Sequence, residues 1–245
     1  MKLWNPCRWW VALFMWLVWS MPDVSLAGAA PDTCADNLGS PIPNFCLVAP
    51  NVLWRGSKPD VAGAAWLIGH GVGSIVNLEL LHDDRDTLSA VHLQDQVDDR
   101  DVLKKAGVDD QAQHVVSYYV VRDWEPLVVV APWLTDDHVA QFLAVVEQAP
   151  KPVYVHCRSG QNRTGVMVAA YKVIVGGRDS RLDIEQVIAD MKGYQGIWFD
   201  ADAAYIRSLT PEHIESIRNK VSKLKAGVQP EAIIRCGVGG CTLDD

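Results

Sequence analysis

The sequence is poor in several features that would each point to a class of protein. It has no internal repeat and no low-complexity tract, which excludes a repeat architecture. Positive charge is scarce, because 22 lysine and arginine residues stand against 30 acidic ones and leave a formal net charge of −8. An acidic chain binds phosphorylated ligands only through a local basic site, so nucleic acid is not expected as a partner. After the first thirty residues, no apolar run approaches the length of a membrane span.

Metal-binding patterns are also missing. The pair Cys236 and Cys241 has no matching second pair and no histidine nearby, as a zinc site would need. The stretch "DQVDDRD" lacks the glycine and the closing glutamate of an EF-hand loop. The run His82–Asp86, "HDDRD", is interpreted as a solvated acidic loop rather than a metal cluster. We therefore expect no metal and no other cofactor.

The first thirty residues have the layout of a secretory signal peptide. A basic start is followed by an apolar stretch over about Trp9–Trp19, by a proline and by small residues around Ala27. The apolar stretch is shorter than the roughly 18–20 residues of a membrane-spanning helix, so an uncleaved anchor is the weaker alternative. Cleavage after Ala27 or after Ala29 fits this pattern. We expect residues 1–29 to be the signal peptide and the protein to be exported, periplasmic or secreted, without stable membrane insertion.

Four of the remaining cysteines lie near the two ends of the expected mature chain. Residues 30–50 are expected to form an extended arm, 51–225 the main domain and 226–245 a tail. Export permits disulfides, and four cysteines allow three pairings. Proximity favours Cys34–Cys46 and Cys236–Cys241, and the alternative joins the two ends of the chain. The fifth cysteine, Cys157, is left without a partner.

Strand-like and helix-like patterns alternate along the main domain. Runs rich in β-branched residues predict strands, and runs with helical apolar spacing predict helices. Thr135 is placed to cap one helix, with Asp136 and Asp137 in its first turn. The strands are expected within 52–60, 72–80, 114–121 and 151–157, and the helices within 60–71, 136–150, 164–177, 182–194 and 211–224. This order predicts a single α/β domain with a central, mainly parallel sheet flanked by helices.

The stretch "VHCRSGQNRTG", residues 155–165, joins a predicted strand to a predicted helix. In parallel α/β sheets, ligands collect where strands lead into helices. Backbone N–H groups of such a loop can converge on an anion, and the following helix adds partial positive charge. Gly160 supplies the backbone freedom that a concave loop needs, and the planar fork of Arg163 can grip two phosphate oxygens. In that positive field we expect Cys157 to be a thiolate, and therefore a nucleophile.

The spacing of these residues resembles the signature of cysteine-dependent protein tyrosine and dual-specificity phosphatases. His156 and Cys157 are followed by Gly160 and, after five intervening residues, by Arg163 and Thr164. Beyond this motif, "VLWRGSKPD", "AAWLIGHGVGSIVNLEL" and "IEQVIADMKGY" are similar to the small dual-specificity-like phosphatases of bacteria, exported ones included. The similarity covers roughly residues 51–209 and weakens across the Asp-rich stretch. It implies a protein-tyrosine-phosphatase-like fold and hydrolysis of phosphate monoesters through a phosphocysteine.

The resemblance also implies a role for each residue of the stretch. Cys157 is the nucleophile, and Arg163 stabilises the equatorial oxygens of the phosphoryl group. Thr164 stabilises the departing thiolate, and His156 orients the loop. The phosphate-binding loop comprises Arg158, Ser159, Gly160, Gln161, Asn162 and Arg163. For Arg158, a solvated loop charge is an equally good interpretation.

The leaving oxygen needs a proton, which in this family comes from an aspartate on a loop upstream. Asp123 is the best candidate, because it follows the strand "SYYVV" closely and lies at a suitable distance before Cys157. Glu125 is the next candidate, while Asp136 and Asp137 are explained as helix-start residues. No clean family motif surrounds Asp123. Arg55, in "WRGSKP", is interpreted as structural or at the edge of the site.

The sequence thus predicts an exported phosphatase for phosphotyrosine, with phosphoserine and phosphothreonine as further substrates. A first alternative applies the same chemistry to a small phosphorylated metabolite, an inositol phosphate or a phosphoinositide. The neutral Gln161 and Asn162 argue against a highly charged substrate, because some relatives have basic residues there. A second alternative is a phospho-binding module without turnover, against which the intact Cys157, Arg163 and Thr164 argue. The expected partner is a phosphorylated protein or small molecule, and a monomer is expected.

Overall fold

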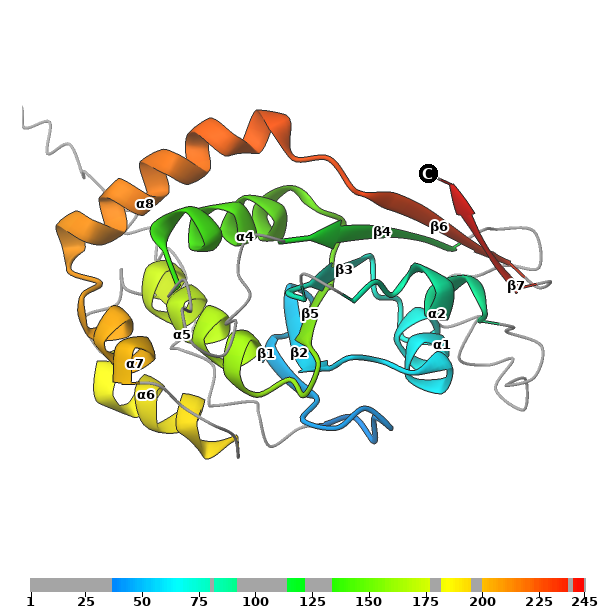
Figure 1. Cartoon of the computed structure of the whole chain (residues 1–245), viewed down its shortest axis with the longest axis horizontal. Coiled ribbons are helices and arrows are strands. Elements are labelled where there is room, and N and C mark those ends of the chain that lie inside the picture. Colours follow the sequence, from blue (N-terminus) through cyan, green and yellow to red (C-terminus); the bar gives the residue numbers. More distant parts are fainter. Residues whose placement is uncertain are drawn as a thin grey trace, which may run out of the picture. The chain divides into compact units, whose positions relative to one another are not determined.

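The computed structural model describes residues 37–79, 82–91, 114–121, 134–176, 182–194, 200–237 and 240–244 (Figure 1). All of them belong to one compact unit, Pro31–Asp245. Their strands form a seven-stranded sheet in the order β1-β2-β5-β3-β4-β6-β7. The strands are β1 (Cys46–Ala49), β2 (Leu53–Ser57), β3 (Ser74–Asn77), β4 (His114–Val120), β5 (Val153–Cys157), β6 (Ala232–Gly237) and β7 (Gly240–Asp244).

The middle of the sheet is parallel and both of its sides are antiparallel. Strands β2, β5, β3 and β4 run in one direction, whereas β1, β6 and β7 are added by antiparallel pairing. The predicted α/β fold is therefore confirmed, and the sheet is mixed. Since β5 lies between β2 and β3, its C-terminal residue Cys157 ends in the centre of the parallel part, where loops from both neighbours meet it.

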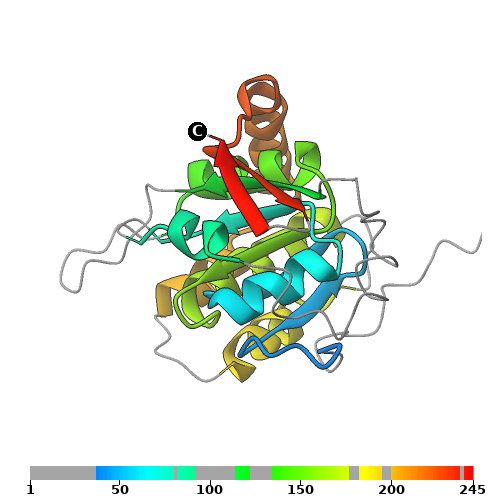
Figure 2. The same cartoon turned by 90° about the vertical axis from the view of Figure 1, so that its right-hand side faces the viewer.

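Helices cover both faces of the sheet (Figures 1 and 2). One apolar core packs under α4, α5, α6, α7 and α8, and a second one under α1 and α2. The helices are α1 (Val61–Gly69), α2 (Arg85–Ser89), α4 (Asp136–Gln148), α5 (Asn162–Gly176), α6 (Ile184–Gly193), α7 (Asp200–Arg207) and α8 (Pro211–Leu224). Among the described helices, none is both long and apolar enough to cross a membrane.

The start of α4 agrees with its sequence signal. The Thr135 hydroxyl accepts the His138 N–H at 3.5 Å, and the Thr135 N–H donates to the ring of His138 at 3.2 Å, which closes a reciprocal cap. Asp136 and Asp137 lie in the first turn, as predicted. Both carboxylates also bind neighbouring helices, so they hold α4 in place and are not placed for proton transfer.

The segment expected to be a tail instead completes the sheet. Strand β6 pairs with β4, and β7 turns back along β6 (Figure 1). Side chains alternate between the two faces of β6, so that Ala232, Ile234 and Cys236 are buried against the α1–α2 core and Arg235 is exposed. That period-two pattern is a strand signal within the residues that were expected to form a tail. Residues 46–49 of the expected arm likewise form β1, and α7 was not predicted.

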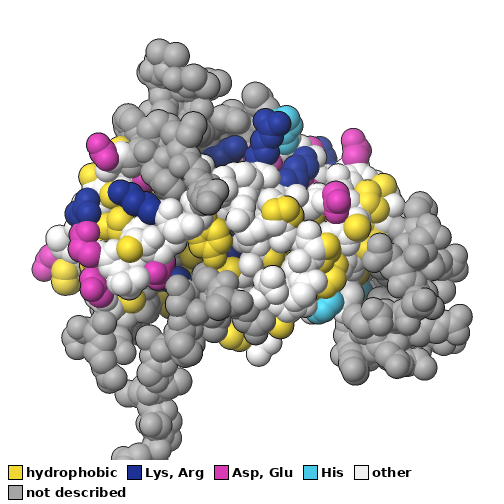
Figure 3. Space-filling view, turned by 90° about the horizontal axis from the view of Figure 1, so that it is seen from below, with side chains coloured by type: hydrophobic (Ala, Val, Ile, Leu, Met, Phe, Trp, Pro, Cys, Tyr) yellow, Lys and Arg dark blue, Asp and Glu magenta, His cyan; other side chains and the backbone are white. Residues whose placement is uncertain are grey.

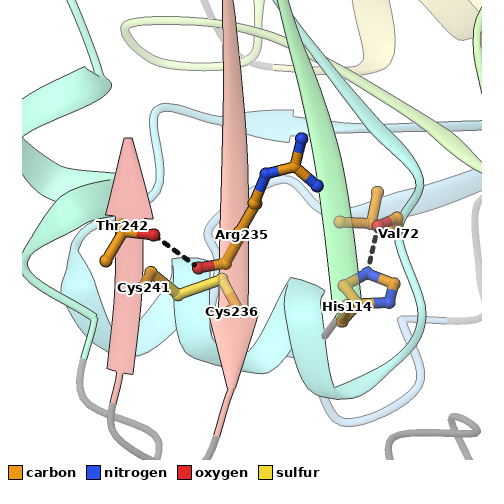
Figure 4. Close-up of a disulfide and its surroundings, with 6 residues drawn as sticks. All are labelled: Val72, His114, Arg235, Cys236, Cys241 and Thr242. Carbon is orange, nitrogen blue, oxygen red and sulfur yellow. Dashed lines mark hydrogen bonds between the residues drawn. A yellow bond between two sulfur atoms is a disulfide. The ribbon is translucent and has the colours of Figure 1, made fainter. Parts of the chain in front are cut away.

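Two cysteine sites lie in these added strands. In the structure the sulfurs of Cys236 and Cys241 are bonded across β6 and β7, at opposed positions of the ladder (Figure 4). Cys46 is also disulfide-bonded. Cys34, its favoured partner, lies outside the described residues. Cys157 is the free cysteine of the described part of the chain.

Candidate active site

Cys157 ends the central strand with its side chain buried. Its exposure is 2%, and the thiol packs with Val153 and Val155 against the core under α4 and α5. Because side chains alternate along a strand, Tyr154 and His156 point to the opposite face, where their rings stack 5.8 Å apart. The side chain of the predicted nucleophile is thus separated from that of its histidine neighbour by the sheet itself.

Gly160 gives the loop after Cys157 its shape. Its φ of +68° lies in the left-handed region, which costs a residue with a β-carbon about 1–2 kcal/mol. A β-carbon here would also overlap the backbone of Gly56 and approach the Ser57 nitrogen to 2.5 Å. The loop therefore lies directly against the end of β2, and only glycine fits at this position.

Three successive carbonyls of the loop are held from outside. The Lys58 N–H donates to the Arg158 carbonyl at 3.3 Å, and Asn44 Nδ2 donates to the Ser159 carbonyl at 2.8 Å. The Arg55 guanidinium donates to the Gly160 carbonyl. In a trans peptide the C=O and the next N–H point in opposite directions. The N–H groups of residues 159–161 are thus turned away from the groups that hold the carbonyls.

Arg55 is an internal support of this loop. Its side chain is only 2% exposed, and its guanidinium lies 3.7 Å from the ring centroid of Tyr194. An arginine can make both contacts at once, because the N–H groups of its planar guanidinium donate within the plane of the group, while the flat face of the guanidinium stacks on the Tyr194 ring. The structural interpretation of Arg55 is confirmed by these contacts.

Arg163 lies in the first turn of α5 and is anchored at the end of β3. Its guanidinium donates to the Leu78 carbonyl at 2.9 Å and lies 3.9 Å from the buried carboxylate of Glu79. The Leu78 N–H donates to the His156 carbonyl at 2.9 Å, so this anchor is adjacent to the end of β5. The structure therefore holds the arginine beside the strand that bears Cys157.

The other predicted site residues occupy two kinds of position. The Thr164 hydroxyl is buried and has no hydrogen-bond partner among the described residues. Arg158 is exposed, and Ser159, Gln161 and Asn162 are half-buried. Figure 3 views the molecule from the side that bears the β5–α5 loop and shows lysine and arginine side chains gathered there. The two candidates for the acid, Asp123 and Glu125, lie outside the described residues.

Asp84 was missed by the sequence interpretation. The expectation that the run His82–Asp86 is a solvated loop is wrong for Asp84, whose side chain is fully buried and lies 3.0 Å from His156 Nε2. Burial by itself raises the pKa of Asp84, but the charge and hydrogen bonding of His156, and then those of Lys58, lower it below its usual value. No local signal separates Asp84 from the exposed Asp83, because only the tertiary fold brings one of them to His156.

A cysteine at the end of a central parallel strand, a glycine-shaped loop and an arginine in the next helix define the class of cysteine-dependent phosphatases. Residues 47–197, more than half of the chain, match the family described as "DSP-PTPase phosphatase fused to NAD+ Kinase". The chain belongs to this family.

Relatives of known class agree with this assignment. The chain is 34% identical over 74 residues to the dual specificity protein phosphatase TpbA of Pseudomonas aeruginosa, which covers 29% of this chain. The match spans 34%, about a third, of the length of these curated relatives.

Solved structures show the same fold at low identity. The crystal structure of P. aeruginosa TpbA has a TM-score of 0.51 at 21% identity, over 74% of this chain and 91% of that one. The core catalytic domain of the PP-IP phosphatase SIW14 from S. cerevisiae has a TM-score of 0.51 at 19% identity, over 75% and 96%. Both likenesses concern the fold alone.

Proposed function

We propose that this protein is an exported phosphatase that hydrolyses phosphotyrosine monoesters, and also phosphoserine and phosphothreonine, through a phosphocysteine on Cys157. The outward anchoring of three successive loop carbonyls carries the proposal. It turns the N–H groups of Ser159, Gly160 and Gln161 away from these anchors, and we assign them to the phosphate side of the loop. Such a nest of donors at a helix N-terminus suits the oxygens of a phosphoryl group.

The first step transfers the phosphoryl group to sulfur. The Cys157 thiolate attacks phosphorus, the S–P bond forms and the bond from phosphorus to the ester oxygen breaks. That oxygen leaves with the electron pair and takes a proton, which we assign to Asp123. Negative charge on the three equatorial oxygens is met by the loop N–H groups and by Arg163, and preorganised donors of this kind typically contribute about 3–4 kcal/mol each.

The second step regenerates the enzyme. Water attacks phosphorus, its proton passes to the Asp123 carboxylate, and the S–P bond breaks with its electron pair returning to sulfur. Inorganic phosphate and the thiolate result. The buried Thr164 hydroxyl has no other partner among the described residues, which suits a hydrogen bond to the thiolate as it leaves. His156 is assigned to orienting the loop.

Substrate choice is inferred from the residues around the loop and from the relatives. A solved structure of a TpbA variant, with a TM-score of 0.50 and 20% identity, contains phosphotyrosine, which supports an aryl phosphate for this chain. The alternative is a phosphorylated small molecule such as an inositol phosphate. The likeness to the PP-IP phosphatase SIW14 and the exposed Arg158 favour it, while the neutral Gln161 and Asn162 argue against it.

Export and the disulfides belong to the same proposal. The signal-peptide pattern of residues 1–29 supports export, and the bonded cysteines in the structure are compatible with an oxidising compartment. Mass mapping of the exported protein without reductant tests both. A mature N-terminus near residue 28 or 30 and Cys236–Cys241 and Cys34–Cys46 bridges are expected, with Cys157 free. A resting protein with Cys157 in a bridge would contradict the assignment.

The activity is tested with the purified protein and p-nitrophenyl phosphate in the presence of EDTA. Hydrolysis that persists without metal and is inhibited by vanadate is expected, and Cys157→Ser should abolish it. Turnover by Cys157→Ser at the wild-type rate would refute the mechanism. A panel of phosphotyrosine, phosphoserine and phosphothreonine peptides and inositol phosphates then ranks the substrates by kcat/KM.

A further inference from the structure

Behind the nucleophile's strand lies a buried pair of a carboxylate and an imidazole that the mechanism above does not use. Asp84 and His156 are both fully buried, with Asp84 Oδ2 3.0 Å from His156 Nε2. They lie on the sheet face opposite to the Cys157 side chain. A buried carboxylate or imidazolium is costly unless it is paired, so such a pair needs a physical reason to be present.

Asp84 is held by groups from four parts of the fold. Lys58 Nζ, from the segment after β2, lies 3.0 Å from Asp84 Oδ1. The Tyr118 hydroxyl, from β4, donates to Asp84 Oδ2 at 3.2 Å and accepts the Asp84 N–H at 3.2 Å. Asn77 Nδ2, at the end of β3, donates to the same hydroxyl at 2.9 Å. Together with His156 on β5, these contacts fix the carboxylate in position and orientation.

The pair is oriented with respect to Cys157. His156 is joined to Cys157 in the chain, whereas Asp84 meets the ring at Nε2, which lies far from the backbone. The imidazole end of the pair is therefore the nearer one to Cys157. A buried imidazole keeps its proton only beside an anion, because burial disfavours the charged form.

We propose that Asp84 is a positioning residue for the phosphatase reaction: it keeps His156 protonated and fixed behind Cys157, and the resulting positive charge favours the Cys157 thiolate. The proposal rests on the proposed function of Cys157 as the nucleophile. Asp84 acts through His156 and does not touch the substrate.

The other charged groups around the pair are unchanged in the Asp84 and Tyr118 variants below. Lys58 faces Asp84 from its exposed side, and Asp83 is the exposed acidic neighbour. On the other side of the β5 end, Arg163 and Glu79 are paired with each other. Burial, and next the charge of Asp84, raise the pKa of Tyr118, so its hydroxyl stays protonated. If the pH at which the Cys157 thiolate forms changes in an Asp84 variant, the change is therefore due to the Asp84–His156 pair.

The test measures the thiolate directly, through its ultraviolet absorbance, in the full chain and between about pH 4 and 9. The thiolate signal is the absorbance of each protein minus the absorbance of the same protein with the additional substitution Cys157→Ser. For Asp84→Asn we expect the half-maximal absorbance to move upward by about one pH unit, since a neighbouring charge shifts ionisation by about 1–3 units. At a pH below the wild-type midpoint, kcat/KM for p-nitrophenyl phosphate should fall about tenfold.

Asp83→Asn is the matched control, because it removes the same charge from the adjacent, exposed residue. Its thiolate titration should coincide with that of the wild type. A folded Asp84→Asn protein that also titrates like the wild type would overturn the proposal. If Asp84→Asn does not fold, the thiolate titration of Tyr118→Phe tests the proposal instead. This variant removes the hydroxyl that donates to Asp84 and changes no charge. A smaller upward shift supports the proposal, and an unchanged titration overturns it.

The thiolate absorbance tests the role of Asp84 independently of phosphatase activity, so the inference and the proposed function can fail separately. A wild-type protein that forms the thiolate with the expected dependence on Asp84 but hydrolyses no phosphate ester would refute the function alone. Hydrolysis through Cys157 with a titration independent of Asp84 would refute the inference alone.

Discussion

Arg55 on β2 donates a hydrogen bond to the carbonyl of Gly160, which stands 105 positions later in the chain. The guanidinium is buried and stacked on Tyr194, so it cannot swing away to solvent. The direction of the Gly160 carbonyl sets the direction of the next N–H group. The buried arginine thus determines one of the donors that would meet a phosphate.

Replacing Arg55 with methionine should therefore impair the loop more than the fold. The Gly160 carbonyl loses a buried donor, a change that costs about 1–3 kcal/mol, and kcat/KM for p-nitrophenyl phosphate should fall about tenfold to a hundredfold. Arg218→Met is a matched control, because Arg218 donates to the Ile174 carbonyl at 2.5 Å near the other end of α5. It should lower the Tm without lowering kcat/KM. Equal kinetic effects of both variants would refute the special role of Arg55.

Gly160→Ala should remove most of the activity. The added methyl group overlaps the Gly56 backbone, so the loop must move, and we expect kcat to fall by about two orders of magnitude, as for loss of an oxyanion donor. Gly71→Ala separates backbone strain from overlap, because Gly71 has φ +79° and open space around its β-carbon position. It should cost about 1–2 kcal/mol of unfolding free energy and leave kcat unchanged. An active Gly160→Ala protein would show that the loop tolerates displacement.

Removing the Thr164 hydroxyl should slow the second chemical step. Thr164→Val keeps the buried shape, and without a hydrogen bond to the leaving thiolate the phosphocysteine should accumulate. We expect kcat to fall about tenfold and a burst of p-nitrophenol to appear in rapid-mixing experiments, since a hydrogen bond to a charged group contributes about 1.5–3 kcal/mol. Thr164→Ser keeps the hydroxyl and should show no burst. Lower kcat without a burst would place the effect on the first step.

The contact between α8 and α4 should make stability depend on pH. His213 Nδ1 donates to the Ser208 carbonyl at 2.9 Å, and its Nε2 lies 2.8 Å from Asp136 Oδ1. The hydrogen bond with Ser208, and then that with Asp136 and its charge, raise the pKa of His213 above its ordinary value of 6.5. The proton is thus bound more tightly in the folded state, and the stabilisation is complete below pH 6.5 and lost as the pH rises through the folded-state pKa.

The corresponding measurement is urea unfolding of the wild type and His213→Gln at two pH values. At a pH below 6.5 the wild type should be more stable by roughly 0.5 kcal/mol, the size of a partly exposed ion pair. At alkaline pH this advantage should shrink toward zero. A difference that grows with pH would mean that the neutral ring is the stabilising form.

Local patterns were sufficient for the central strands and for the loop. The run "VYVHC" followed by "RSGQNRTG" changes from β-branched to polar residues at the cysteine, and this change predicts both the end of β5 and the start of α5. Thr135 predicted the start of α4 in the same way. These signals are local, because caps and strand ends depend on residues within one turn of each other.

Contacts between distant segments escaped the sequence interpretation. Asp84 and Asp83 are chemically identical neighbours, and only the tertiary fold buries one of them beside His156 of β5 and Tyr118 of β4. The expected tail contains the strand pattern of β6, but the place of the β6–β7 hairpin in the sheet depends on β4, more than a hundred residues earlier. The local alternation indicates a strand, but it does not identify β4 as the partner of that strand.

The sequence by itself determined the chemistry proposed for this protein, because it has a cysteine, a glycine and an arginine at a spacing that suits a phosphate-binding loop. The tertiary structure alone decided how that loop is held, by Arg55 and Asn44 from outside and by the Asp84–His156 pair behind the strand. The reason is physical. Spacing along the chain places groups that are close in sequence, whereas a buried charge finds its partner only when the sheet and its helices close around it.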